Sequence, residues 1–141
     1  DYTYFTDNQG RVKKISGELK NGPTRTRNIY QQTEASIEPK DGIRGQDDGG
    51  HMIAARFFGP SEQINYFPQN KIHNRPSSKA DEGLWYKMEE EFAAKLSESP
   101  PVKVEITITP VFSGSSKRPI EFVVDYKYNN GLPLRKVIPN P

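Results

Sequence analysis

The sequence of 141 residues contains no cysteine and only two histidines, His51 and His73. The lack of cysteine excludes a disulfide framework, a thiolate nucleophile and a cysteine-based zinc site. Any metal ion must therefore be held by oxygen atoms and histidine nitrogens. A general base working near neutral pH would be one of the two histidines. Taken alone, each histidine is more often structural or solvated than catalytic.

Long apolar runs are also missing. No segment is long enough to span a bilayer, and no signal peptide is recognisable. The hydrophobic fraction is 33% and the mean hydropathy is -0.84, but the 7 Phe, 7 Tyr and 1 Trp can fill a core with few residues. A chain of this length predicts a single domain over residues 1–141. Because it starts at Asp1 without a methionine, we expect a C-terminal fragment of a larger protein.

The formal net charge of +2 says little, but the charges are unevenly distributed. Between residues 11 and 27, one acid, Glu18, accompanies six basic residues: Arg11, Lys13, Lys14, Lys20, Arg25 and Arg27. Between residues 81 and 98, two lysines accompany six acids: Asp81, Glu82, Glu89, Glu90, Glu91 and Glu98. This split predicts that one face meets phosphates while another repels them.

Alternating polar and apolar residues predict antiparallel strands that form two pairs. The predicted strands are residues 2–5, 11–19, 102–109 and 120–128, with a weaker candidate over residues 25–33. The first two strands are joined by a turn signal and are typical of a hairpin. Residues 129–131 predict a tight turn, and the tail after it contains three prolines.

The middle of the chain has a different composition. Residues 36–50 are typical of a surface loop leading to His51, and Met52–Ala55 is expected to be a short buried strand. The two glycines before His51 permit close approach of a ligand. Residues 61–80 are rich in asparagine and glutamine, which are costly to bury without partners. This segment is therefore either a functional loop or a merely exposed one.

A helix is predicted from a capping box at Ser78 to about Leu96. At about 100° per residue, its apolar residues form one stripe: Trp85, Met88, Phe92 and Leu96. Glu89 projects into this stripe, whereas Glu90 and Glu91 point to the other side. An ionised carboxylate on an apolar face is costly unless it is paired. Glu89 therefore either has a function or pairs with an arginine at the edge of the stripe.

These elements together predict an α+β fold in which one main helix packs against an antiparallel β-sheet. Four motifs follow one another along the chain: Gly49-Gly50-His51-Met52-Ile53-Ala54, Asn65-Tyr66-Phe67-Pro68-Gln69-Asn70, Asn74-Arg75 and Trp85-Tyr86-Lys87-Met88-Glu89. They resemble the motifs of DNA/RNA non-specific endonucleases of the ββα-metal (His-Me finger) class. Ser113–Pro119 is similar to a turn of the subgroup found as C-terminal toxin domains of bacterial polymorphic toxins. The resemblance implies a ββα-metal finger within the fold.

The resemblance also implies catalytic roles. His51 would be the general base that deprotonates water for in-line attack on a phosphodiester. Asn74 would bind Mg²⁺, with Mn²⁺ as the alternative ion, and Glu89 would orient a metal-bound water. Members of the class with an Asp-Arg-Gly-His motif carry an arginine where this chain has Gly49. Arg27, in the basic stretch, is our candidate for stabilising the transition state, with an ordinary surface role as the equal alternative.

The remaining candidates are assigned to substrate binding: Arg25, Arg75, Arg118 and Asn65. Asn65 and Asn70 also fit amides that fix a loop. The implied function is a metal-dependent endonuclease acting on DNA, with RNA as an alternative substrate, in the role of an antibacterial toxin. This implies secretion within a larger toxin, action in the target-cell cytoplasm and a cognate immunity protein as partner.

Two other hypotheses stay open. One is a non-catalytic module that binds nucleic acid or protein on the same fold. The other is a zinc-dependent nuclease of the HNH type, which would need a second ligating histidine. His73 stands next to Asn74 instead of at a helical ligand spacing.

Overall fold

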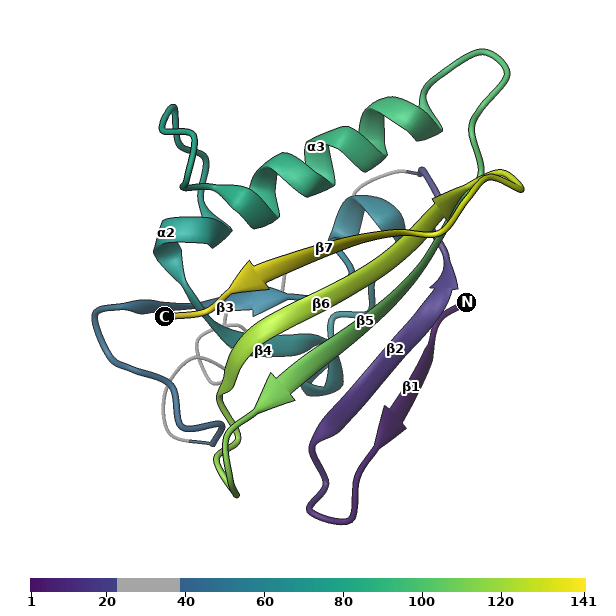
Figure 1. Ribbon diagram of the computed structural model, residues 1–141. Helices are drawn as coiled ribbons and strands as arrows, with labels where there is room; N and C mark the ends of the chain where they lie inside the picture. The colour runs from purple at the N-terminus through teal and green to yellow at the C-terminus, as the bar shows by residue number, and fades with distance from the viewer. Residues whose placement is uncertain (23–38) are drawn as a thin grey trace.

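The computed structural model describes residues 1–22 and 39–141. They form a five-stranded antiparallel sheet, a two-stranded sheet and two α-helices (Figure 1). The large sheet has the order β1-β2-β5-β6-β7: β1 (Thr3–Thr6), β2 (Val12–Glu18), β5 (Val104–Phe112), β6 (Pro119–Tyr128) and β7 (Leu134–Pro139). The small sheet pairs β3 (Asp47–His51) with β4 (Tyr66–Asn70), and the helices are α2 (Lys71–Asn74) and α3 (Leu84–Leu96). The predicted α+β class is confirmed.

The large sheet follows from the alternation of the sequence. β5 and β6 pair with Ile108 opposite Val124, which confirms the second predicted strand pair. Because every second side chain faces the core, Val104 and Phe122 are fully buried. The predicted first hairpin also forms, since β1 pairs with β2. β7 pairs with β6 at the sheet edge, where proline is tolerated; the sequence indicated only a proline-containing tail there.

Helix α3 lies along one face of the large sheet (Figure 1). The predicted apolar stripe is buried: Trp85, Met88, Phe92 and Leu96. The ring centroids of Trp85 and Phe122 are 5.3 Å apart, and those of Phe92 and Tyr126 are 5.2 Å apart. Burying each large apolar side chain contributes about 1.5–3 kcal/mol. This packing fixes the rotation of the helix and therefore the direction of Glu89.

Helix α3 starts later than the predicted capping box at Ser78. Gly83, the residue before the helix, has a φ of 64°, in the left-handed region that helical geometry excludes. Its N–H donates to the carbonyl of Ile72 at 2.8 Å. Upstream, Oγ of Ser77 accepts from the N–H of Lys79 at 3.1 Å. The predicted start is wrong because the bond of Gly83 to α2, helped by the local bond at Ser77, holds a turn that competes with the helix.

The middle of the chain differs from the prediction in two places. The strand is Asp47–His51, and Met52–Ala54 after it is buried but is no strand. The N–H of Met52 instead bonds to the carbonyl of Asn65 at 2.9 Å. Within residues 61–80, expected to be a loop, the buried strand β4 runs directly into α2. The strand predicted over residues 25–33 lies outside the described residues.

Candidate active site

His51 and Glu89 meet between β3 and α3. His51 is the last residue of β3, opposite Tyr66, and its side chain is 22% exposed. Its Nε2 atom lies 3.6 Å from Oε2 of Glu89, whose side chain is 13% exposed. This oxygen is buried and has no hydrogen-bond partner among the described residues. An unsatisfied buried acceptor costs about 1–3 kcal/mol, so the atom is available to a donor bound at the site.

The next two carboxylates of α3 have partners other than His51. Glu90 accepts a hydrogen bond from Arg56 at 2.9 Å, and a carboxylate oxygen of Glu91 lies 3.3 Å from Nζ of Lys136. The helical period therefore separates Glu89 from its neighbours as predicted. Of the two explanations for an inward carboxylate, the described residues favour the first, because they place Glu89 against a histidine.

Asn74, the last residue of α2, is tied to β3 through Asp48. Its Nδ2 donates to Asp48 at 3.0 Å, and Arg75 donates to both oxygens of the same carboxylate at 2.9 and 2.7 Å. Burial alone would raise the pKa of Asp48, but the bonds from Arg75 and Asn74 outweigh it and lower that pKa. An ionised carboxylate only accepts hydrogen bonds, so it fixes the amide orientation and leaves Oδ1 of Asn74 to bind a cation.

Sequence reasoning did not single out Asp48 as a site residue. Its signal was the position of a carboxylate on the same short segment as His51. The structure shows why that position matters, because Asp48 and His51 are carried by one strand, β3. Strand β3 therefore carries both Asp48, which bonds to Asn74, and His51, which lies against Glu89.

His73 occupies a structural position. It is 5% exposed, and its Nδ1 accepts from the N–H of Leu84 at 3.5 Å, at the start of α3. Burial lowers the pKa of His73, since the charged form would lose its hydration. Among the described residues, no group of three or more His, Cys, Asp or Glu side chains is arranged to hold a metal ion. The ligand atoms available at the candidate site are the amide oxygen of Asn74 and the carboxylate of Glu89, which suit hard cations.

Asn65 fixes the turn that follows His51. The residue is 1% exposed, and its amide bonds to N and O of Ile53 at 3.0 and 2.8 Å and to O of Pro60 at 3.1 Å. The hydroxyl of Tyr4 donates to its Oδ1 at 2.8 Å. This geometry does not favour the predicted substrate contact, because the amide is buried and all its bonding directions are used. Its position agrees with the loop-fixing alternative.

The candidate arginines fall in different places. Arg25 and Arg27 lie outside the described residues, so the arginine assigned to the transition state stays a prediction. Arg75 is exposed and bound to the β3 carboxylate described above. Arg118 is 9% exposed and forms two bonds of 2.7 Å with Asp47. The predicted substrate contact of Arg118 does not fit this arrangement, because its guanidinium is buried against a carboxylate.

Gly50 lets the side chain of Gln69 pack directly over β3. A Cβ atom at Gly50 would lie 2.1 Å from Oε1 of Gln69. Gln69 is 1% exposed, and neither polar atom of its amide has a hydrogen-bond partner within the described ranges. The glycine was expected to admit a ligand, but the space beside it is filled by the facing strand.

The surface at His51 is shallow. The hollow there has a volume of about 20 Å³, and its lining includes His51, Ala55, Pro60 and Tyr66. Sites for small molecules usually enclose about 300–1,000 Å³. The open surface therefore suits a polymer better than a small ligand.

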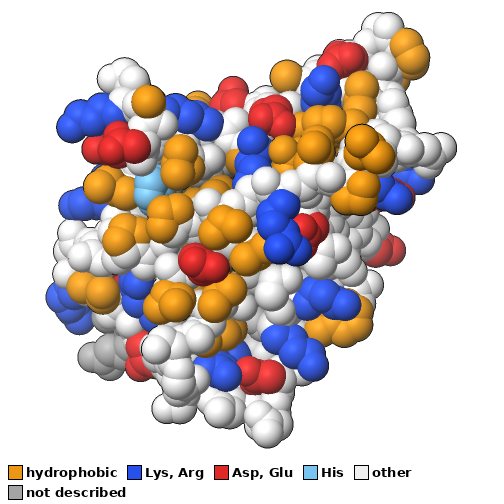
Figure 2. Space-filling view, viewed as in Figure 1, with side chains coloured by type: hydrophobic (Ala, Val, Ile, Leu, Met, Phe, Trp, Pro, Cys, Tyr) orange, Lys and Arg blue, Asp and Glu red, His pale blue; other side chains and the backbone are white. Residues whose placement is uncertain are grey.

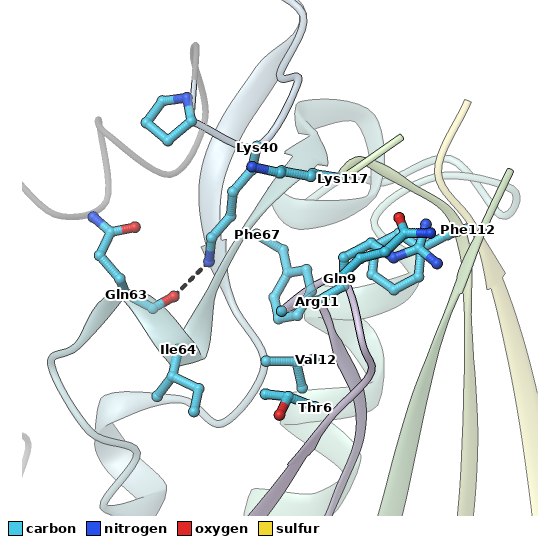
Figure 3. Close-up of a pocket in the computed structure, with 12 residues that line it drawn as sticks. Thr6, Gln9, Arg11, Val12, Lys40, Gln63, Ile64, Phe67, Phe112 and Lys117 are labelled. Carbon is cyan, nitrogen blue, oxygen red and sulfur yellow. Dashed lines mark hydrogen bonds between the residues drawn. The ribbon is translucent and has the colours of Figure 1, made fainter. Parts of the chain in front are cut away.

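A larger cleft of about 290 Å³ lies between the β1–β2 hairpin and β4 (Figure 3). Phe67 and Phe112 form part of its apolar wall. Lys40 at its rim donates to the carbonyls of Gln63 and Tyr66, and burial lowers the pKa of Lys40 to about 8. His51 is not among the residues that line this cleft. We assign no catalytic role to this cleft, because the ammonium group of Lys40 is already bound by backbone carbonyls.

Charges of both signs are interspersed on the face shown in Figure 2. Two acids of the segment 81–98 have lysines beside them: Nζ of Lys79 lies 3.6 Å from Glu82, and Nζ of Lys95 lies 3.6 Å from Glu98. Such exposed pairs stabilise little, but they cancel the local field. The predicted division into a basic face and a repelling acidic face stays a prediction, because Arg25 and Arg27 of the basic stretch lie outside the described residues.

The sequence and the fold both match known nucleases. The family model for DNA/RNA non-specific endonucleases matches residues 1–130. Type VII secretion system protein EssD of Staphylococcus aureus (strain USA300) is 34% identical over 140 residues, which are 97% of this chain and 21% of EssD. The chain thus spans about a fifth of the length of the curated relatives it matches.

Solved nuclease structures share the fold. NucA from Streptococcus agalactiae without metal has a TM-score of 0.72 at 20% identity, over 99% of this chain and 70% of that one. NucA with a bound magnesium ion has a TM-score of 0.65 at 17% identity, over 100% and 72%. Sda1 nuclease with a bound zinc ion has a TM-score of 0.76 at 15% identity, over 100% and 74%. At these identities the likeness concerns the fold alone. In the described ranges, no helix has both the length and the apolar composition needed to cross a membrane.

Proposed function

Since the chain belongs to the DNA/RNA non-specific endonuclease family, we propose that it is a metal-dependent endonuclease that cleaves DNA, with RNA as the alternative substrate. The observation that supports this most directly is the 3.6 Å contact between Nε2 of His51 and Oε2 of Glu89. A partly exposed imidazole beside a buried carboxylate is suited to accept a proton from water. The shallow surface around it is open to a polymer.

In the proposed reaction, Nε2 of His51 accepts a proton from the water whose oxygen attacks phosphorus. The new P–O bond forms in line with the ester P–O bond that breaks, and the leaving oxygen takes a proton from solvent. Oε2 of Glu89 has no partner in the described residues, so it is free to accept a hydrogen bond from a water and orient it. Contacts to phosphates would make the affinity fall as salt rises, and would make cleavage tolerant of sequence.

The described residues fit a hard divalent cation, and we propose Mg²⁺, with Mn²⁺ as its substitute. Oδ1 of Asn74 would be the protein ligand, because Asp48 holds the other end of that amide. Glu89 would act from one shell further out, through hydration water. When bound, such an ion stabilises the charge that develops on the phosphate and on the leaving oxygen.

Glu89→Ala tests this assignment against Glu90→Ala, its outward-facing neighbour. Loss of Glu89 should lower activity and raise the Mg²⁺ concentration for half-maximal cleavage by about ten- to a hundredfold. Loss of Glu90 removes a carboxylate paired with Arg56 at 2.9 Å and should leave the titration unchanged. Equal titrations for the two variants would remove Glu89 from the site.

The biological role is proposed from the likeness to EssD, a protein of the type VII secretion system. We propose that the chain is the toxin domain of a larger secreted protein, that it acts in the cytoplasm of a target cell, and that a cognate immunity protein blocks it. Expression of the domain in a bacterium should degrade the chromosome and stop growth, whereas His51→Ala should do neither. Equal growth of cells carrying the two forms at equal protein levels would argue against the toxin role.

A further inference from the structure

Asn140 joins three parts of the fold at the end of the small sheet opposite His51. It is 2% exposed. Its Oδ1 accepts from the N–H of Asn70 at 2.7 Å, and its Nδ2 donates to the carbonyls of Pro68 and Pro119 at 3.1 and 2.7 Å. In Figure 1 this part of the chain lies beside β3. A buried amide with all these bonds acts as a fixed joint.

Arg118 completes the same joint. It donates to the carbonyls of Asn140 and Pro141, both at 2.9 Å, and two further bonds of its guanidinium hold Asp47. The side chain of Asp47 has 0% exposure, and Asp47 stands opposite Asn70 in the small sheet. We call Asp47, Asn70, Arg118 and Asn140 the clasp. The clasp therefore fixes the start of β3 and the end of β4 to each other and to β6.

Asn70 connects the clasp to the candidate metal ligand. Its Oδ1 accepts from the N–H of Ile72 at 2.9 Å and so caps α2, while its Nδ2 donates to the carbonyl of Pro141 at 2.9 Å. A helix as short as α2 is not stable alone, so its direction depends on anchors at its two ends. Asn70 holds the first end, and the bond from Asn74 to Asp48 holds the last.

We propose that Asn140 is a positioning residue for the metal ligand Asn74 and acts through Asn70 and α2. The inference rests on the proposed function, because it requires Asn74 to bind the ion. Asn140 lies beyond residues 1–130, the part that the family model matches, so the role is inferred from this structure alone. Without the clasp, the capped end of α2 loses its anchor, and Oδ1 of Asn74 has to be ordered when the ion binds.

The test compares the domain with Asn140→Ala by calorimetric titration of Mn²⁺ alone, thermal unfolding and cleavage at saturating Mn²⁺. The Kd for Mn²⁺ should rise by about tenfold, as for groups that orient a ligand without touching the ion. Cleavage at saturating metal should stay near that of the parent. If Asn140→Ala does not fold, Asn140→Ser takes its place, because its short side chain cannot reach the N–H of Asn70 and the carbonyls of Pro68 and Pro119 together, and its Kd should rise likewise.

Ile138→Ala is the matched control, because Ile138 is 2% exposed on the neighbouring strand and has no part in the clasp. It should lower the Tm and leave the Kd unchanged. A parent-like Kd in Asn140→Ala, or in Asn140→Ser if the alanine variant does not fold, would overturn the positioning role, and so would an equal rise in Ile138→Ala. Asn74→Ala separates the two proposals: if it binds Mn²⁺ like the parent, the metal assignment fails and the inference fails with it. If only Asn74→Ala loses binding, the positioning role alone is wrong.

Discussion

Replacing Asn65 by alanine should destabilise the fold without weakening substrate binding. The side chain makes four hydrogen bonds, to N and O of Ile53, to O of Pro60 and from the hydroxyl of Tyr4. The substitution leaves these groups without partners at a position that is 1% exposed. Each stranded buried group costs about 1–3 kcal/mol, and water entering the vacated space recovers part of this. The expected loss is about 3–5 kcal/mol, near the upper end for a single substitution.

Tyr4→Phe is the matched control, since it removes one of these bonds and keeps the ring. It should cost about 1 kcal/mol. Urea unfolding of the two variants gives both values from the midpoints, provided that the slopes agree. DNA affinity, measured with a chelator to prevent cleavage, should be the same for folded Asn65→Ala and the parent. A loss of stability below about 1 kcal/mol together with weaker DNA binding would refute the reasoning and restore Asn65 as a substrate contact.

Three other substitutions test the packing around the site. Gly50→Ala should cost about 1–3 kcal/mol, because its methyl group meets Oε1 of Gln69 at 2.1 Å; an unchanged Tm would contradict this close packing. Arg118→Met should cost about 3–5 kcal/mol by leaving the buried Asp47 unpaired, and adding Asp47→Asn should recover part of the loss in denaturant unfolding. Burial lowers the pKa of Lys40 from 10.5 to about 8, so its contribution to stability is complete above pH 10.5 and is lost as the pH falls through about 8. Lys40→Met should therefore flatten the rise in stability between these values by up to about 1 kcal/mol per pH unit, and parallel profiles would exclude the shift.

The parts of the structure that follow a local period could be predicted from the sequence. Trp85 and Phe92 recur with the helical period, and this places Glu89 on the inner face without knowledge of what it meets there. The strict alternation around Val104 and Phe122 likewise defines two paired strands. These predictions hold because one buried face decides the orientation of each element.

The parts that depend on distant partners could not be predicted. The N–H of Asn70 bonds to Asn140, 70 residues further along the chain, and Arg118 bonds to Asp47, 71 residues away. A sequence shows that an amide or a guanidinium needs partners, but it does not show which groups supply them. For this reason the buried strand β4 was expected to be a loop, and Arg118 was assigned to the substrate.

The start of α3 was also predicted wrongly because it depends on a partner outside the local sequence. A capping box at Ser78 is a sound local signal, but Gly83 adopts a left-handed conformation and bonds to the carbonyl of Ile72. The turn that precedes the helix is therefore held by α2, whose position the local sequence does not specify.

The central claim is tested most directly by plasmid DNA degradation with the domain and with His51→Ala, each in Mg²⁺ and in a chelator. The account predicts cleavage by the parent with Mg²⁺, none with the chelator, and a rate lower by about a hundredfold to ten-thousandfold in His51→Ala. Because His51 is 22% exposed at the end of β3, the variant should keep the Tm of the parent. Activation by Zn²⁺ but not Mg²⁺ would favour the zinc-dependent alternative. Cleavage by His51→Ala at the parental rate would contradict the mechanism, and failure of the parent to cut DNA or RNA with any divalent ion would indicate a binding module instead of an enzyme.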